Sequence, residues 1–129
     1  MVASDPRFIS QARAILEATD AEMASDSGVI VLGEGVPDPK GVFETTTGLI
    51  EKYGTERVFD TPLSENAMTG ICIGASLSGL RPILVHQRID FALLSMDQIV
   101  NNAAKWHYMF GSQNTVPMVI RMIVGRGWG

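Results

Sequence analysis

The sequence predicts an α/β domain in which a parallel sheet is covered by helices on both faces. Short runs of apolar residues alternate along the chain with segments whose apolar residues recur at helical spacing. Strands that are apolar on both faces are typical of a buried parallel sheet. The 129 residues, 46% of them hydrophobic, are enough for one domain core and too few for two. We therefore treat residues 1–129 as a single domain.

The first half of the chain predicts two helices and two strands. In chain order, we expect an amphipathic helix from Phe8 to Met23, a buried strand at 29–32, a helix at 42–53 and a short strand at 57–60. Ser4 is the expected cap of the first helix, with Pro6 in its first turn. Gly54 is the expected end of the second helix.

The second half continues the alternation. We expect a helix at 64–80, a strand at 82–86, a long helix at 91–110 and a last strand at 118–124. The helix at 64–80 carries small residues at spacings of three and four, including Ala67, Gly70 and Gly74, which lets another helix approach closely. The glycine-rich residues 125–129 follow a strand directly, where a sheet protein normally continues, so we expect the chain to be part of a longer protein.

Composition excludes several classes of function. The formal net charge is -4 and no Lys/Arg cluster occurs, which argues against nucleic acid or an anionic membrane as the main partner. No apolar stretch approaches the roughly 18 residues of a membrane span, and the acidic start is unlike a signal peptide. The single cysteine, Cys72, lies among apolar and small residues and is expected to be a buried, inert thiol. We expect a soluble intracellular protein.

Candidate site residues follow the predicted strands, because ligands of open parallel sheets gather beyond the carboxyl ends of the strands. Glu34 follows the first strand between two glycines, which lets a ligand or a second chain approach; the alternative is a solvated loop acid. Glu65 opens the helix capped by Ser64. It either stabilises the helix dipole, by about 0.3–1 kcal/mol, or is a buried carboxyl that exchanges a proton with a heterocyclic nitrogen.

A polar stretch follows the strand at 82–86. His86, Arg88 and Asp90 alternate, so they project on one side if the strand continues. They either bind an anionic substrate or form a salt-bridge network at the rim. Phe91 is by default a core aromatic. No His/Cys/Asp/Glu set has the spacing of a transition-metal site.

Five stretches carry a resemblance to a known family. They are Leu32–Val36, Gly48–Gly54, Arg57–Glu65, Gly79–Pro82 and Met96–Lys105. The chain resembles the beta subunit of the decarboxylating component of 2-oxoacid dehydrogenase complexes, of the pyruvate, branched-chain and acetoin type. The resemblance covers nearly the whole chain, in order and without large gaps.

The resemblance implies a transketolase-like pyrimidine-binding domain that binds thiamine diphosphate. The acid matching Glu65 bonds the aminopyrimidine ring nitrogen and favours the imino tautomer, whose nitrogen deprotonates the thiazolium carbon that attacks the 2-oxoacid. The aromatic matching Phe91 stacks on the pyrimidine. The acid matching Glu34 belongs to an acidic tunnel between paired active sites, and a backbone carbonyl near Met118 helps to hold a structural potassium ion.

The resemblance also implies partners. An alpha subunit binds the diphosphate and its magnesium, a second beta subunit completes a heterotetramer, and a lipoyl acyltransferase core receives the acyl group. The C-terminal domain of the family's beta subunit is absent from these 129 residues, so we expect this polypeptide to be inactive alone. We expect the bacterial cytoplasm, or the mitochondrial matrix if the chain is eukaryotic, with no presequence.

The polar residues 86–90 leave the substrate open, because the pyruvate enzymes carry a mostly apolar and aromatic run there. His86 and Arg88 are therefore candidates on the substrate side. Two alternatives remain: a transketolase-type two-carbon transfer subunit, and a non-catalytic interaction domain of the same fold. The combination of Glu34, Glu65 and Phe91 favours the enzyme, because an interface alone needs no buried acid.

Overall fold

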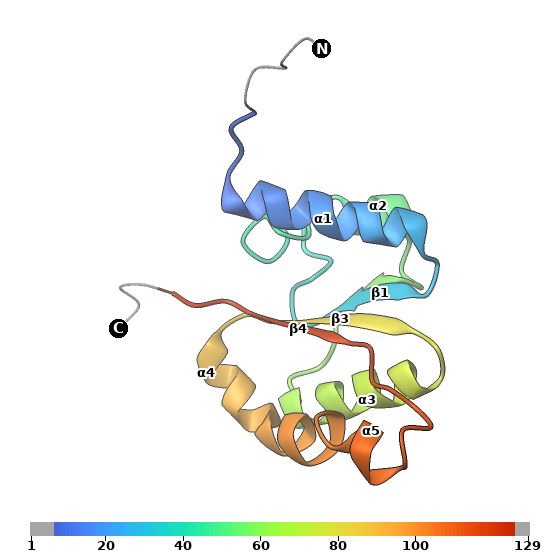
Figure 1. Cartoon of the computed structure of the whole chain (residues 1–129). Coiled ribbons are helices and arrows are strands. Elements are labelled where there is room, and N and C mark those ends of the chain that lie inside the picture. Colours follow the sequence, from blue (N-terminus) through green and yellow to red (C-terminus); the bar gives the residue numbers. More distant parts are fainter. Residues whose placement is uncertain (1–6, 126–129) are drawn as a thin grey trace.

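The computed structural model describes residues 7–125 and contains a four-stranded parallel sheet (Figure 1). The strands are β1 (Val29–Leu32), β2 (Val58–Phe59), β3 (Arg81–His86) and β4 (Val119–Met122), in the order β2-β1-β3-β4. Every neighbouring pair runs parallel. The predicted parallel α/β sheet is confirmed, and all its carboxyl ends point to one edge.

Helices cover both faces of the sheet (Figure 1). One layer holds α1 (Gln11–Ser25) and α2 (Leu49–Tyr53). The other holds α3 (Glu65–Leu77), α4 (Ile89–Ala92), the 3-10 helix η1 (Leu93–Ser95), the π-helix η2 (Gln98–Ala103) and α5 (Trp106–Met109). The chain is thus a three-layer domain with the sheet in the middle.

Two apolar clusters pack the helix layers against the sheet. Alternate residues of β1 enter opposite clusters, because successive side chains of a strand point to opposite faces. Val31 packs with Met23 of α1, and Leu32 packs with Met68 and Cys72 of α3. Burial raises the pKa of the Cys72 thiol to about 12, as expected for the inert thiol that the sequence predicts.

The first helix begins later than its apolar pattern suggests. Ser10 is its N-cap, and the Ser10 hydroxyl accepts a hydrogen bond from the Arg13 N–H at 3.1 Å. Phe8, where we expect the helix to begin, lies before this cap and is 92% exposed. The predicted cap Ser4 and Pro6 lie outside the described residues.

The prediction of a helix at 42–53 is wrong in its first half. Only α2 is helical, and the preceding loop contains Phe43 and Glu44 with positive φ. The Thr46 hydroxyl donates to the Val36 carbonyl at 2.9 Å. Threonine hydroxyls compete in this way for backbone groups, which draws the chain into a loop rather than a helix.

The predicted long helix at 91–110 is also wrong as a continuous element. The structure divides it into α4, η1, η2 and α5. The 3-10 turn places the Ser95 hydroxyl against the Glu65 carbonyl, at 2.9 Å. Within the π-helix, the Asn102 amide donates to Gln98 at 3.0 Å. Both η1 and η2 pack against α3, so the irregular turns coincide with tertiary contacts to that helix.

Two smaller differences concern the ends of elements. The helix predicted at 64–80 is confirmed as α3, but the Ser64 side chain makes no capping hydrogen bond. The last strand, β4, is shorter than the predicted 118–124. Residues 126–129 of the predicted glycine-rich tail lie outside the described residues.

Candidate active site at the carboxyl ends of the strands

Three of the predicted site residues lie at one edge of the sheet. Glu34 follows β1 by two residues, His86 ends β3, and Glu65 begins α3. Burial is the main cause of the raised pKa of Glu34 and of the lowered pKa of His86; the negative charge of Glu65 adds to the first shift and opposes the second, so the three groups interact electrostatically. The residues predicted from the strand ends therefore lie at one edge, although they are far apart in the sequence.

Glu65 is a buried acid whose backbone is held firmly. Its side chain and backbone together are only 8% exposed. Its carbonyl oxygen accepts from the hydroxyls of Thr69 and Ser95, each at 2.9 Å. Within residues 7–125, no hydrogen bond involves the Glu65 carboxylate. The carboxylate oxygens therefore keep their capacity to bind a ligand.

Glu34 binds a proton more readily than an ordinary glutamate. Burial is the largest cause of its raised pKa, followed by repulsion from Glu65 and Asp60. Neighbouring segments hold its backbone in place, since Gln87 donates to the Glu34 carbonyl at 3.1 Å and the Gly35 N–H donates to Asp60 at 3.1 Å. This edge of the sheet therefore gathers three carboxylates.

Gly33 allows β1 and β3 to meet closely beneath this site. Its φ is +146°, and a Cβ built there would lie 2.3 Å from the Val85 carbonyl oxygen. Such a distance is far below van der Waals contact, and the conformation itself favours glycine. Only a glycine fits directly before Glu34.

His86 is a buried imidazole linked to the Glu65 backbone through the Ser95 hydroxyl. It is 2% exposed, and its Nε2 lies 3.4 Å from the Ser95 hydroxyl. Burial lowers the pKa of His86, and the charge of Glu65 only partly opposes this shift. The side chain is therefore neutral near pH 7 and belongs to the support of Glu65. Contact between His86 and a substrate stays a prediction.

Arg88 and Asp90 do not extend the strand. Because β3 ends at His86, the predicted alternation along a continuing strand is not formed. Instead Arg88 and Asp90 form an ion pair at 2.8 Å, which matches the rim salt bridge of the two readings. The Arg88 guanidinium also lies 5.5 Å from the centre of the Phe91 ring.

Phe91 is not a core residue. It lies in α4 and is 39% exposed, so its default interpretation as a core aromatic is wrong. The segment that carries it is tied to Glu65 through the Ser95 hydroxyl. An aromatic surface is therefore available near the carboxyl edge of the sheet.

Met118 precedes β4 and packs partly buried against the α3-side cluster. Its N–H donates to the Val116 carbonyl at 2.9 Å. A potassium role for the Met118 carbonyl stays a prediction. Among residues 7–125, no group of three or more His, Cys, Asp or Glu residues is arranged to hold a metal ion.

Three supporting residues were not predicted from the sequence. Asp60 directly follows β2 at the same edge, so the strand-end rule contains the signal that finds it. Ser95 and Gln87 have no such signal, because they bond backbone carbonyls 30 and 53 residues away in the chain. Only the tertiary structure identifies them.

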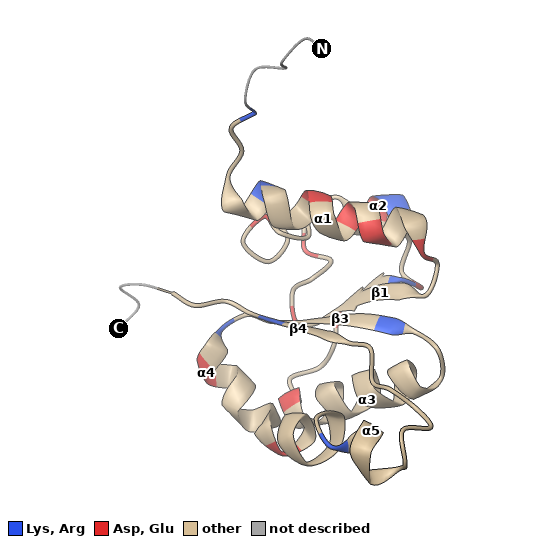
Figure 2. Ribbon diagram, viewed as in Figure 1, with Lys and Arg blue, Asp and Glu red and all other residues tan. Residues whose placement is uncertain are grey.

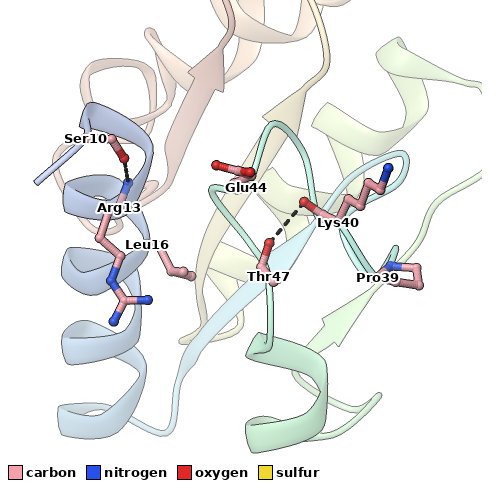
Figure 3. Close-up of a pocket in the computed structure, with 7 residues that line it drawn as sticks. All are labelled: Ser10, Arg13, Leu16, Pro39, Lys40, Glu44 and Thr47. Atoms are coloured by element: carbon pink, nitrogen blue, oxygen red, sulfur yellow. Dashed lines mark hydrogen bonds between the residues drawn. The ribbon is translucent and has the colours of Figure 1, made fainter.

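A separate pocket of about 510 Å³ lies between α1 and the loop before α2 (Figure 3). Arg13 and Leu16 line it from α1, while Lys40 and Glu44 line it from the loop. The Thr47 hydroxyl closes the loop by donating to the Lys40 carbonyl at 3.0 Å. None of the predicted site residues lines this pocket.

A family profile described as "Transketolase, pyrimidine binding domain" matches residues 9–128. The chain belongs to this family. The match spans every strand of the sheet and both helix layers, so the pyrimidine-binding fold is the fold of this protein.

Curated relatives of this pyrimidine-binding domain narrow the family further. The beta subunit of the mitochondrial pyruvate dehydrogenase E1 component of Pisum sativum is 42% identical over 95% of this chain and 36% of the pea protein. The corresponding subunit of Rickettsia bellii is 43% identical, over 88% and 35%. Subunit beta-1 of Arabidopsis thaliana is 44% identical, over 84% and 30%. The predicted resemblance to such beta subunits is confirmed.

The chain spans about a third of the length of these relatives. The relatives include bacterial and mitochondrial proteins. Within the part of the chain that the structure describes, no helix has the length and apolar character needed to cross a membrane.

Proposed function

We propose that this chain is the pyrimidine-binding part of the beta subunit of a thiamine-diphosphate-dependent 2-oxoacid dehydrogenase. One observation carries the proposal. Glu65 is a buried carboxylate without a hydrogen bond inside residues 7–125, and it lies at the ligand-binding edge of a pyrimidine-binding domain. Such a carboxylate matches the polar end of an aminopyrimidine.

The chemistry of the side chains at this edge fits that half of the cofactor. Glu65 supplies an acid for the ring nitrogen, and Phe91 supplies an exposed aromatic ring for stacking. When bound, thiamine diphosphate supplies the nucleophilic carbon for decarboxylation of a 2-oxoacid and acyl transfer to a lipoyl carrier. The diphosphate and its magnesium are assigned to the alpha subunit.

The residues of this chain hold and move protons in the proposed reaction. Glu65 exchanges a proton with the pyrimidine nitrogen, and the hydroxyls of Ser95 and Thr69 fix the backbone from which its carboxylate projects. Glu34, whose pKa is raised by burial and by the negative charges of Glu65 and Asp60, is the next carboxylate along this edge. Together they form the start of the proposed acidic tunnel.

The proposed partners are the alpha subunit, a second beta subunit and the lipoyl acyltransferase core. Large apolar side chains exposed on the α3 layer, such as Ile71 at 62% and Leu94 at 62%, support contacts with other subunits. Catalysis requires the alpha subunit, so the chain is inactive alone. The proposed location is the cytoplasm in bacteria or the mitochondrial matrix in eukaryotes; the pea relative is named as mitochondrial.

A transketolase-type two-carbon transfer is the second candidate. It is favoured by the polar character of the strand end, where buried His86 and the ion pair of Arg88 and Asp90 lie. Hydroxyl-rich substrates need such hydrogen-bonding groups, whereas a short apolar 2-oxoacid does not. The third candidate is a non-catalytic interaction domain, which has the same fold but no chemical role for Glu65.

The test uses the full-length natural protein assembled with its alpha subunit. Glu65→Gln is compared with Glu56→Gln, which removes an exposed acid next to β2. Cofactor binding is measured by calorimetry and circular dichroism, and turnover is measured with several 2-oxoacids and ketose phosphates. We expect Glu65→Gln to bind the cofactor and to lose about 10²–10⁴-fold in turnover, while Glu56→Gln behaves as wild type.

Other outcomes separate the candidates. Turnover of ketose phosphates but not 2-oxoacids supports the transketolase-type reaction. A wild-type assembly that does not bind the cofactor contradicts both enzymatic proposals and leaves the interaction domain.

A further inference from the structure

A second pocket, of about 350 Å³, lies where the start of α1 passes over the end of β4. In Figure 1, α1 lies above the sheet, of which β4 is the last strand. Its lining comes from α1, the loop before α2 and β4 with the residues after it. The lining residues are Gln11, Ala12, Ile15, Phe43, Thr45 and 121–124. None of these residues belongs to the Glu65 site.

Arg121 is the charged residue of this pocket. It pairs in register with Val85 of β3, and one of its terminal nitrogens, Nη2, donates to the Thr45 hydroxyl. The Thr45 hydroxyl in turn donates to the Val42 carbonyl at 2.6 Å, which fixes the acceptor. The other terminal nitrogen, Nη1, is buried without a hydrogen-bond partner among residues 7–125.

Among the described residues, Arg57 and Arg121 are the two arginines without an ion pair, but Arg57 donates to the carbonyls of Met23, Asp26 and Val29, whereas Nη1 of Arg121 has no acceptor. Arg7, Arg13, Arg81 and Arg88 each pair with a carboxylate, whereas no ion pair within the described residues includes Arg121. Burial alone lowers the pKa of Arg121, and no acidic group offsets this shift. A guanidinium has five donors and remains charged in proteins, so the buried, unpaired Nη1 of half-buried Arg121 is best satisfied by an acceptor, and an anionic one also compensates the charge.

We propose that Arg121 anchors a carboxylate-binding site between α1, the 43–45 loop and β4. The forked guanidinium binds a carboxylate through two parallel hydrogen bonds, and a turn of the side chain toward the pocket supplies Nη1 with its acceptor. Ile15, Phe43 and Ile123 form apolar walls beside it. The first turn of α1 lines the same pocket, and its N-terminal dipole also favours an anion.

The ligand class is therefore a carboxylate with a short aliphatic part. The volume lies at the lower end of the range for small-molecule sites. The carboxylate comes either from a small organic acid in solution or from an aspartate or glutamate elsewhere in the assembled protein. Both sources supply a carboxylate. They differ in whether the protein binds a small carboxylate, such as propionate, that is added to the solution.

The experiment measures thermal unfolding of the full-length natural protein in sodium propionate and in sodium chloride of equal ionic strength. NMR follows the methyl groups of Ile15 and Ile123 during the propionate titration. Arg121→Met removes the charge at similar length, and Arg121→Lys keeps a charge without the fork. Arg13→Met is the matched control, because Arg13 lies on α1 but is already paired with Glu17.

With a small acid as ligand, propionate raises the unfolding temperature of wild type and Arg13→Met and shifts both methyl signals. Arg121→Met loses this response, and Arg121→Lys keeps a weaker one. With a carboxylate of the protein itself, wild type does not respond to propionate, and Arg121→Met unfolds at a much lower temperature than Arg13→Met. The proposal is overturned if propionate stabilises Arg121→Met as it does wild type. It is also overturned if neither propionate nor Arg121→Met changes the unfolding temperature.

Discussion

The two helix layers differ in the kind of surface that they turn outward. The layer of α1 and α2 carries ion pairs, including Arg13 with Glu17 and Lys52 with Asp20 (Figure 2). The layer of α3, α4 and α5 carries few charges in the same view. There, exposed apolar side chains such as Leu93, at 68%, take the place of the charges.

The difference does not arise from poor packing of the second layer. Both layers close a buried apolar core against the sheet, with Val31 and Val85 on the α1 side and Leu32 and Leu84 on the α3 side. The α3 layer is therefore as well folded as the other, yet its outer face resembles a surface that another protein covers. Glu65 begins the first helix of this same layer, so the site and the apolar face lie together.

The largest expected effect tests whether the α3 layer and the sheet form a true core between them. Leu84 is fully buried, so Leu84→Ala is expected to lower the free energy of unfolding by about 2–5 kcal/mol. Leu93→Ala, on the exposed face of the α3 layer, is expected to change it by less than about 0.5 kcal/mol. Denaturant unfolding monitored by circular dichroism measures both. Equal losses for the two variants contradict the distinction between core and outer face.

The next effect compares two glycines, one at the sheet and one on the outer face of α3. Gly33→Ala is expected to cost about 1–3 kcal/mol or more, because its Cβ meets the Val85 carbonyl in a backbone conformation that favours glycine. A Cβ on Gly74 meets nothing within 4 Å. Gly74→Ala is therefore expected to stabilise the domain, by about 0.5–1 kcal/mol, as alanine does in a helix interior.

Thermal unfolding measures both glycine variants, and analytical ultracentrifugation of the full-length protein measures assembly. If α3 approaches another helix through its small residues, Gly74→Ala weakens assembly although it stabilises the domain. A stabilised variant with unchanged assembly contradicts the predicted close helix contact at Gly74.

The smallest effect concerns the pH dependence that His86, at the end of β3, gives to the stability of the domain. Because burial lowers the pKa of His86, the unfolded chain takes up a proton at a higher pH than the folded chain. The stability from the neutral imidazole is therefore fully present above about pH 6.5, the unfolded value, and is lost as the pH falls toward the lower folded value. His86→Phe is expected to flatten this part of the profile.

His107→Phe is the matched control for His86, because His107 is exposed and its removal leaves the buried imidazole in place. Denaturant unfolding at a series of pH values below 7 measures how the free energy of unfolding changes with pH in wild type and both variants. A slope that persists in His86→Phe shows that another group carries the proton uptake.

The secondary-structure pattern was predictable where local sequence and tertiary packing agree. The apolar run Val29–Leu32 is β1 as expected, because a strand that is buried on both faces needs apolar residues throughout. The same pattern failed at 42–48 and at 91–110. In the first segment the hydroxyl of Thr46 bonds a distant carbonyl, and in the second Ser95 bonds the carbonyl of Glu65.

The sequence by itself determined the parallel α/β fold and the edge at which Glu34, Glu65 and His86 gather. Apolar alternation specifies which faces are buried, and parallel strands bring all carboxyl ends to one edge. Only the tertiary structure decided which residues support this edge and which stand apart from it. The link between Ser95 and Glu65 and the environment of Arg121 both depend on atoms far apart in the chain. No local pattern encodes such contacts, because they form only when separate elements pack together.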